Sequence, residues 1–232
     1  MRQILSAKQI RDAEQQVFDT QPDVDLMGRA AAAVARIADA VAPEGTVLVA
    51  VGPGNNGGDG LFAAARLAPH RPVLLWLAMG KAHEAGLEAA VRAGAQEVDT
   101  VGAIGSLVDC ALVIDLPSGL DADAAEPHES FRAAHTVTFA APKPCHVLQP
   151  AASRCGRLHV VDIGLDVEAG NLRQAEESDV ARWWPVPHEG SDKYSRGVVT
   201  VDTGSETYPG AALLTCAGAL HAGAGMVRYT GR

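Results

Sequence analysis

The sequence predicts an α/β fold in which a mainly parallel sheet is covered on both faces by helices, a three-layer sandwich. Short apolar runs rich in β-branched residues alternate along the chain with alanine-rich stretches of helical spacing. The chain has 232 residues, of which 47% are apolar and 20% charged. This composition excludes a disordered chain and allows one large domain, or one domain plus a fragment.

Two helices are expected first. Ser6 and Gln9 fit a capping box, and apolar residues then recur on one helical face to about Thr20. Asp25 is the expected N-cap of the second helix, and Pro43 ends it.

Strands and helices then alternate. The spacing predicts strands at 46–51, 73–77, 112–114, 136–139 and 158–161, with helices at 59–67 and 83–93.

A domain boundary is expected where the apolar periodicity weakens, after about residue 166. We therefore predict a first domain over 1–170 and a linker over 171–192. Residues 193–232 read as a strand, a small-residue helix and a second strand, which is too short for a domain of this class. This last segment is expected to be the opening of a second domain that is cut short.

Composition also restricts the functional class. The net charge is −9, which argues against a nucleic-acid binder. No apolar run approaches the roughly 18 residues of a membrane span, so a cytoplasmic protein is expected. The cysteines Cys110, Cys145, Cys155 and Cys216 form no C-x-x-C pair, and we interpret them as core thiols.

A glycine-rich loop over 52–60 follows the first of these expected strands and leads into a helix. At that position, backbone N–H groups and the helix dipole can hold a phosphate. A plain turn with Asp59 as helix N-cap is the competing interpretation. Asn55 and Asn56 favour a ligand or cation, because their amides need partners.

Residues 52–57 also match G-x-G-x-x-G, which raises the possibility of a nicotinamide-dependent dehydrogenase. The next strand ends at 77–80 without the acidic residue that would bind a ribose hydroxyl, which argues against that class. No Gly-Lys-Ser or Gly-Lys-Thr follows the loop, so a Walker A site is excluded.

Three longer strings are more specific: Gly-Asn-Asn-Gly-Gly-Asp-Gly at 54–60, Asp-Leu-Pro-Ser-Gly-Leu-Asp at 115–121 and Thr-Phe-Ala-Ala-Pro-Lys-Pro at 138–144. Together they resemble the NAD(P)HX epimerase family over residues 5 to about 166. Residues 193–232 look like the opening of a ribokinase-like NAD(P)HX dehydratase domain. The resemblance implies a Rossmann-like fold and a metabolite-repair isomerase that epimerises the R and S hydrates of NADH or NADPH. No dehydratase activity is expected from these 232 residues.

The resemblance also implies site residues. Asn55, Asn56, Gly57, Gly58, Asp59 and Asp115 would bind the substrate, Asn56 and Ser118 would help bind a potassium ion, and Asp115 would be the catalytic acid/base. Lys143 is a weaker candidate. The expected partner is the small-molecule hydrate, with no nucleic acid and no membrane, and a homo-oligomer stays open.

Competing structural interpretations accompany these assignments. Asp115 and Ser118 can simply build a turn. Lys143 lies between prolines and is at least as well explained as a solvated surface lysine. His135, His146 and His159 receive no role, since their spacing fits no metal site.

One departure from the family pattern is visible. The family has two aspartate-bearing strands here, whereas this chain has room only for 111–114 before Asp115. The first aspartate, a potassium ligand in the family, and the loop that covers the substrate have no counterpart that can be aligned. The alternative function is therefore a non-catalytic nucleotide- or partner-binding module of the same fold.

Overall fold

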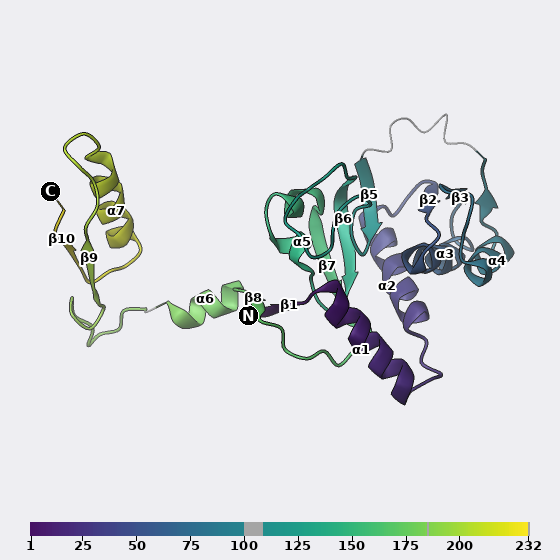
Figure 1. The fold of residues 1–232 in the computed structure, drawn as a ribbon, viewed down its shortest axis with the longest axis horizontal. Coiled ribbons are helices and arrows are strands. Elements are labelled where there is room, and N and C mark those ends of the chain that lie inside the picture. The colour runs from purple at the N-terminus through teal and green to yellow at the C-terminus, as the bar shows by residue number, and fades with distance from the viewer. Residues whose placement is uncertain (100–108, 185, 232) are drawn as a thin grey trace. The chain divides into compact units, whose positions relative to one another are not determined.

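The structure is a computed structural model that describes residues 1–99, 109–184 and 186–231. It consists of two compact units, Met1–Gln174 and Ala175–Arg232. Figure 1 shows the order of the elements along the chain.

The first unit opens with a short strand and two helices: β1 (Arg2–Ile4), α1 (Ala7–Thr20) and α2 (Leu26–Val41). The capping box of Ser6 and Gln9 is confirmed, because each side chain bonds the other residue's backbone N–H. Asp25 caps α2 by accepting from the N–H of Gly28 at 2.7 Å. No helix in the described ranges is long and apolar enough to cross a membrane.

A first parallel sheet holds β2 (Val47–Val51), β3 (Val73–Leu77) and β4 (Gln96–Glu97) in the order β2-β3-β4. The helices α3 (Asn55–Leu67) and α4 (Glu84–Arg92) connect these strands. Because α3 already begins at Asn55, the interpretation of Asp59 as its N-cap is wrong, and Gly54 occupies that position.

A second parallel sheet follows, with the order β5-β6-β7. Its strands are β5 (Asp109–Ile114), β6 (Arg132–Phe139) and β7 (Arg157–Val161). The short helix α5 (Pro144–Val147) and the 3₁₀ turn Ala151–Arg154 lie between β6 and β7. The unit is thus the Rossmann-like α/β sandwich that was expected.

The two sheets do not join. Among the described residues β2 pairs only with β3, and β5 pairs only with β6. Both strands pack beneath α3, since a Cβ placed on Gly60 would lie 3.3 Å from Ile114 and 3.4 Å from Val49. Ala50 of β2 is exposed, which agrees with the position of β2 at the edge of its sheet. The interruption agrees with the shortage of one strand in the sequence.

The core of the first unit lies between α2–α4 and the strands of both sheets. Its buried residues are Ala30, Ala31, Val34, Ala35, Val51, Leu61, Ala63, Ala64, Leu67, Val73, Leu75, Ala90, Ala95, Val137, Phe139 and Ile163. Cys145 and Cys155 are buried free thiols, as expected, while Cys216 is half-buried. The side chain of Cys110 lies outside the described part of the chain.

The segment 171–192 carries two elements that sequence reasoning missed. The strand β8 (Leu172–Gln174) pairs antiparallel with β1, and the helix α6 (Glu177–Trp183) begins the second unit. Strands of three residues leave too little periodicity to be read from sequence.

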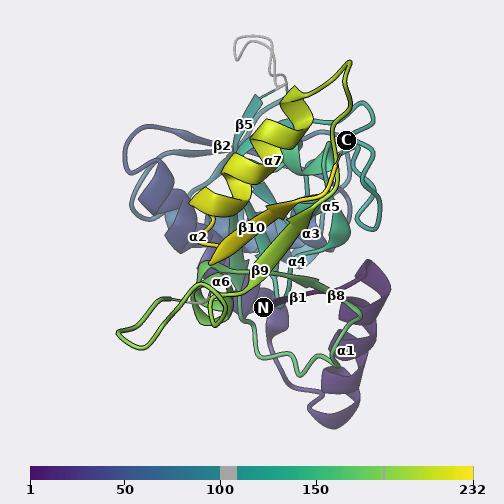
Figure 2. The same cartoon turned by 90° about the vertical axis from the view of Figure 1, so that its left-hand side faces the viewer.

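The second unit ends in a parallel strand pair, β9 (Val198–Val201) and β10 (Met226–Tyr229), joined by α7 (Gly210–His221). Figure 2 shows α7 lying along these strands. No residue of α7 is buried, and Leu213 and Leu214 are 71% and 77% exposed. Its assignment as the opening of a second domain stays a prediction.

Candidate functional site

A pocket of about 310 Å³ lies at the carboxyl ends of β5 and β6 and the N-terminus of α3. Ligands of open α/β sheets bind at this edge, and the volume is within the range of small-molecule sites. Its lining residues are Ala7, Ile10, Arg11, Glu14, Phe18, Leu26, Met27, Ala30, Asn55, Asn56, Asp59, Asp115, Leu116, Ala122, Phe139, Lys143 and Ile163. The loop motif and the Asp-Leu-Pro-Ser-Gly motif therefore meet in one cavity.

Helix α1 forms one wall of this pocket, which sequence reasoning did not anticipate. Its start is fixed by two backbone donors: the N–H of Leu5 bonds the carbonyl of Pro142 at 3.0 Å, and that of Ala7 bonds Asp123 Oδ1 at 2.8 Å. The helix then brings Arg11 and Glu14 to the pocket. The amphipathic pattern indicated a buried face but could not indicate what that face would cover.

The glycine loop places its asparagines at the first turn of α3. Asn55 and Asn56 are exposed, line the pocket and have no side-chain hydrogen bond to any described residue. Gly54 provides no side-chain cap, so the first N–H groups of α3 are available to a ligand.

The glycines of the loop serve its geometry. A Cβ on Gly57 would lie 2.0 Å from the carbonyl oxygen of Gly52, so only glycine fits. A Cβ on Gly58 would lie 3.1 Å from Met27 Cε, the flexible end of a side chain. Neither glycine is among the residues that line the pocket.

Asp59 lies one turn into α3 and is only 6% exposed. Asp59 lines the pocket, and its side chain has no hydrogen bond or ion pair with any other described residue. Burial, followed by the negative charges of Asp115 and Glu14, raises the pKa of Asp59 to about 7. Burial also raises the pKa of Glu14, against the opposing charges of Lys143 and Arg11.

Asp115 lies at the carboxyl end of β5 with a left-handed backbone, φ 67°. Its N–H donates to the carbonyl of Val137 at 2.6 Å, which holds this uncommon conformation. Its Oδ1 accepts from Thr138 Oγ1 at 3.0 Å and from Lys143 Nζ at 2.5 Å. The described residues provide no partner for Oδ2, which leaves that oxygen for a ligand.

Lys143 is not a solvated surface lysine, and that interpretation was wrong. Its side chain is 6% exposed, and its ammonium group forms an ion pair with Asp115. Prolines on both sides correctly indicated a loop, but they carried no information about burial, which depends on Asp115, 28 residues earlier.

His146, to which no role was assigned, forms hydrogen bonds with the backbone of both Lys143 and Asp115. Its Nδ1 accepts from the backbone N–H of Lys143 at 2.9 Å, so the ring proton is on Nε2. Nε2 therefore donates to the carbonyl of Asp115 at 2.8 Å. His135 and His159 contact each other at 3.0 Å and do not line the pocket.

Ser118 is exposed in the turn after β5 and is not among the residues that line the pocket. Its backbone carbonyl accepts from the N–H of Phe131 at 3.1 Å, which is the turn-building role. Its hydroxyl has no hydrogen bond to any described residue. The structure thus brings Asn55, Asn56, Asp59, Asp115 and Lys143 together, with Ser118 outside the lining.

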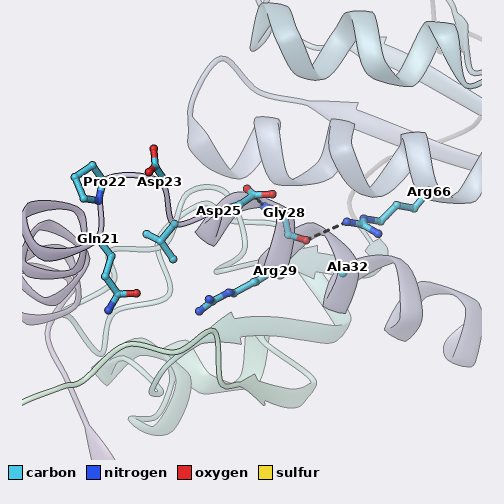
Figure 3. Close-up of a pocket in the computed structure, with 9 residues that line it drawn as sticks. Gln21, Pro22, Asp23, Asp25, Gly28, Arg29, Ala32 and Arg66 are labelled. Atoms are coloured by element: carbon cyan, nitrogen blue, oxygen red, sulfur yellow. Dashed lines mark hydrogen bonds between the residues drawn. The ribbon is translucent and has the colours of Figure 1, made fainter.

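A second, more open pocket of about 680 Å³ lies at the connection between α1 and α2 (Figure 3). Both arginines that line it are hydrogen-bonded to backbone carbonyls. Arg66 donates to the carbonyl of Gly28 at 3.4 Å, and Arg29 donates to the carbonyl of Ile163 at 2.8 Å. None of the predicted site residues lines it. The pocket beneath α1 is therefore the candidate site.

Comparison with known families gives a match to the family described as "YjeF-related protein N-terminus", in two segments, 23–101 and 85–145. The segments together include the glycine loop, Asp115 and Lys143.

Named relatives are of two kinds. The chain is 36% identical to the bifunctional NAD(P)H-hydrate repair enzyme Nnr of Mycobacterium leprae over an alignment of 269 positions, gaps included, that covers 100% of this chain and 56% of the relative. It thus spans about half the length of such relatives. It is 34% identical to the NAD(P)H-hydrate epimerase of Clavibacter michiganensis subsp. michiganensis, covering 70% of this chain and 90% of the relative. The relative from Rhodopirellula baltica, also named NAD(P)H-hydrate epimerase, is 29% identical over 73% of this chain.

Proposed function

Because the chain belongs to the family of the YjeF-related protein N-terminus, we propose that it is an NAD(P)H-hydrate epimerase that interconverts the R and S hydrates of NADH or NADPH. The observation that carries the proposal is the pocket beneath α1, where Asn55, Asn56 and Asp59 of one motif lie with Asp115 of another. Relatives named for this activity support it.

The reaction needs no redox change. The hydrate carries a hydroxyl group on the carbon beside the ring nitrogen, so the nitrogen lone pair can expel it and water can add back from the other face. The site must then supply a proton to the departing oxygen and remove one from the water. Asp115 is suited to one of these transfers, because it lines the pocket and its Oδ2 has no partner among the described residues, while Oδ1 is held by Lys143 and Thr138.

The rest of the substrate is a dinucleotide with two linked phosphates. The N-terminus of α3 offers them unpaired N–H groups and the positive end of the helix dipole. Asn55 and Asn56 at the same turn can donate to phosphate or ribose oxygens. Binding there would place the nicotinamide end near Asp115.

Purified protein is expected to speed interconversion of the R and S hydrates, because a positioned acid/base group typically raises a reaction rate about 10²- to 10⁴-fold. The measurement is chromatographic separation of the two forms after mixing one pure form with the protein, with heat-inactivated protein as the control. If the protein binds the hydrate without changing the interconversion rate, the non-catalytic binding module is supported. The edges of β2 and β5, which have no strand partner among the described residues, favour that alternative.

We also propose a potassium ion at Asn56 and Ser118. The donor chemistry fits, because both side chains carry neutral oxygens, which suit a hard cation. Both are exposed, and neither has a side-chain hydrogen bond to a described residue. A bound ion would supply positive charge near the substrate phosphates.

Potassium is expected to raise the melting temperature of the protein relative to choline at equal ionic strength. An ion at about 100 times its dissociation constant stabilises the folded state by about 2.7 kcal/mol. Asn56→Ala and Ser118→Ala should each abolish the shift, whereas Asn55→Ala should keep it. An equal shift with choline, or a shift that survives both substitutions, would count against the site.

A further inference from the structure

Two carboxyl groups of the pocket have opposite surroundings. Asp115 has an ammonium group at 2.5 Å and a hydroxyl at 3.0 Å. Asp59 lines the same pocket and is 6% exposed, yet it has no hydrogen bond or ion pair with a described residue. A carboxylate in this largely buried position without a cation partner is costly, so Asp59 is suited to carry a proton, whereas Asp115 has Lys143 as its ion-pair partner.

The charges around Asp59 agree with its carrying a proton while Asp115 pairs with Lys143. Negative groups reach it from two sides, Asp115 from β5 and Glu14 from α1. The cations that line the pocket are Lys143, which pairs with Asp115, and Arg11 of α1. Burial and two nearby negative charges therefore disfavour the ionised form of Asp59. They raise its pKa to about 7, which is close to neutral pH.

Epimerisation by loss and return of water needs a donor and an acceptor on different faces of the ring. Two carboxyl groups in one pocket can divide these tasks, one giving a proton and the other taking one. Pairs of titratable groups whose environments separate their protonation states are the usual solution.

Building on the proposed epimerase function, we propose that Asp59 and Asp115 form a two-carboxyl dyad that holds one exchangeable proton, with Asp59 as the resting donor. The C6–O bond breaks, the leaving oxygen takes the proton of Asp59 and departs as water, and the nitrogen lone pair forms the N1=C6 bond. Water then adds to C6 from the other face, its proton passes to Asp115, and the electron pair returns to nitrogen. One proton has moved from Asp59 to Asp115, and the reverse epimerisation or exchange with solvent restores it.

The activity test is Asp59→Asn in the full chain, with each pure hydrate at pH 7. Asparagine matches the size of a protonated aspartic acid and is likewise neutral, so the fold should be kept. The interconversion rate should fall roughly 10²- to 10⁴-fold, and each wild-type turnover in ¹⁸O-water should place one ¹⁸O at C6. Asp12→Asn is the control, an exposed carboxylate of α1 paired with Lys8, and should keep the wild-type rate. A rate for Asp59→Asn within about threefold of wild type would overturn the dyad.

Direct titration separates this inference from the proposed function. In intact protein labelled with ¹³C at the aspartate carboxyl groups and free of substrate, one signal should titrate near pH 7 and be absent in Asp59→Asn. Asp115→Asn should move its midpoint to lower pH, because a neighbouring negative charge is removed. Titration of Asp59 near the ordinary value of about 3.9 would overturn the dyad even in an active epimerase.

The stability of the protein provides a third measurement. Because folding raises the pKa of Asp59, this group's contribution to stability is present at low pH and is lost as pH rises through about 7. Asp59→Asn removes that loss, so its melting temperature relative to wild type should rise between about pH 4, near the ordinary pKa of an aspartate, and about pH 7, and should stay level above that. A difference that is independent of pH would contradict a protonated resting Asp59.

Discussion

Asp115→Asn is expected to slow interconversion of the two hydrates roughly 10²- to 10⁴-fold per folded molecule. The substitution preserves size and removes the carboxyl group that accepts or gives the proton. Asparagine also tolerates the left-handed backbone at this position, φ 67°, better than most residues. The backbone bonds to Val137 and His146 should therefore persist.

The rate must be separated from stability in this variant, because Asp115 is the ion-pair partner of the buried Lys143. A lower melting temperature is expected in either interpretation of Asp115, so only turnover per folded molecule decides between them. Asp121→Asn is a suitable control, since Asp121 holds the following turn by accepting from the N–H of Asp123 at 2.9 Å and lies outside the pocket lining. A near-normal rate in Asp115→Asn would remove that residue from the catalytic role.

Local signals predicted most of the fold correctly. The capping box at Ser6 and the cap at Asp25 are satisfied within three or four residues, so sequence alone contains both partners. The β3 strand falls at 73–77 as expected, because a continuous apolar run of this short length is typical of a buried strand. The meeting of Asn55, Asp59 and Asp115 follows from the rule that motifs at strand ends share one edge of the sheet.

The parts of the fold and of the site that the sequence did not predict depend on contacts between residues far apart in the chain. Such contacts leave no local sequence pattern. The wall made by α1 requires the bond from Ala7 to Asp123, which lies 116 residues later. The burial of Lys143 depends on Asp115 in the same way. A missing strand in the sequence indicated that the sheet would be interrupted between β2 and β5. That the remaining edges do not pair within the described part of the chain is a property of the fold and has no signal in the sequence.

Lys143→Met is expected to lower the free energy of unfolding by about 3–5 kcal/mol near neutral pH, because it leaves the carboxylate of Asp115 without its counter-ion in a largely buried site. Methionine keeps the length and the apolar stem of lysine. The measurement is denaturant unfolding of the full chain. Lys8→Met is the matched control: its ion pair with Asp12 is exposed, with side chains 76% and 55% accessible, and its loss should cost at most about 1 kcal/mol.

The double variant Lys143→Met with Asp115→Asn tests whether the loss comes from an uncompensated charge or from packing. When both charges are removed, no unpaired ion remains, and part of the stability lost in Lys143→Met should return. If packing of the lysine stem were the cause, the double variant would be at least as unstable as Lys143→Met alone. Recovery of stability in the double variant would show that Lys143 stabilises the fold by compensating the charge of Asp115.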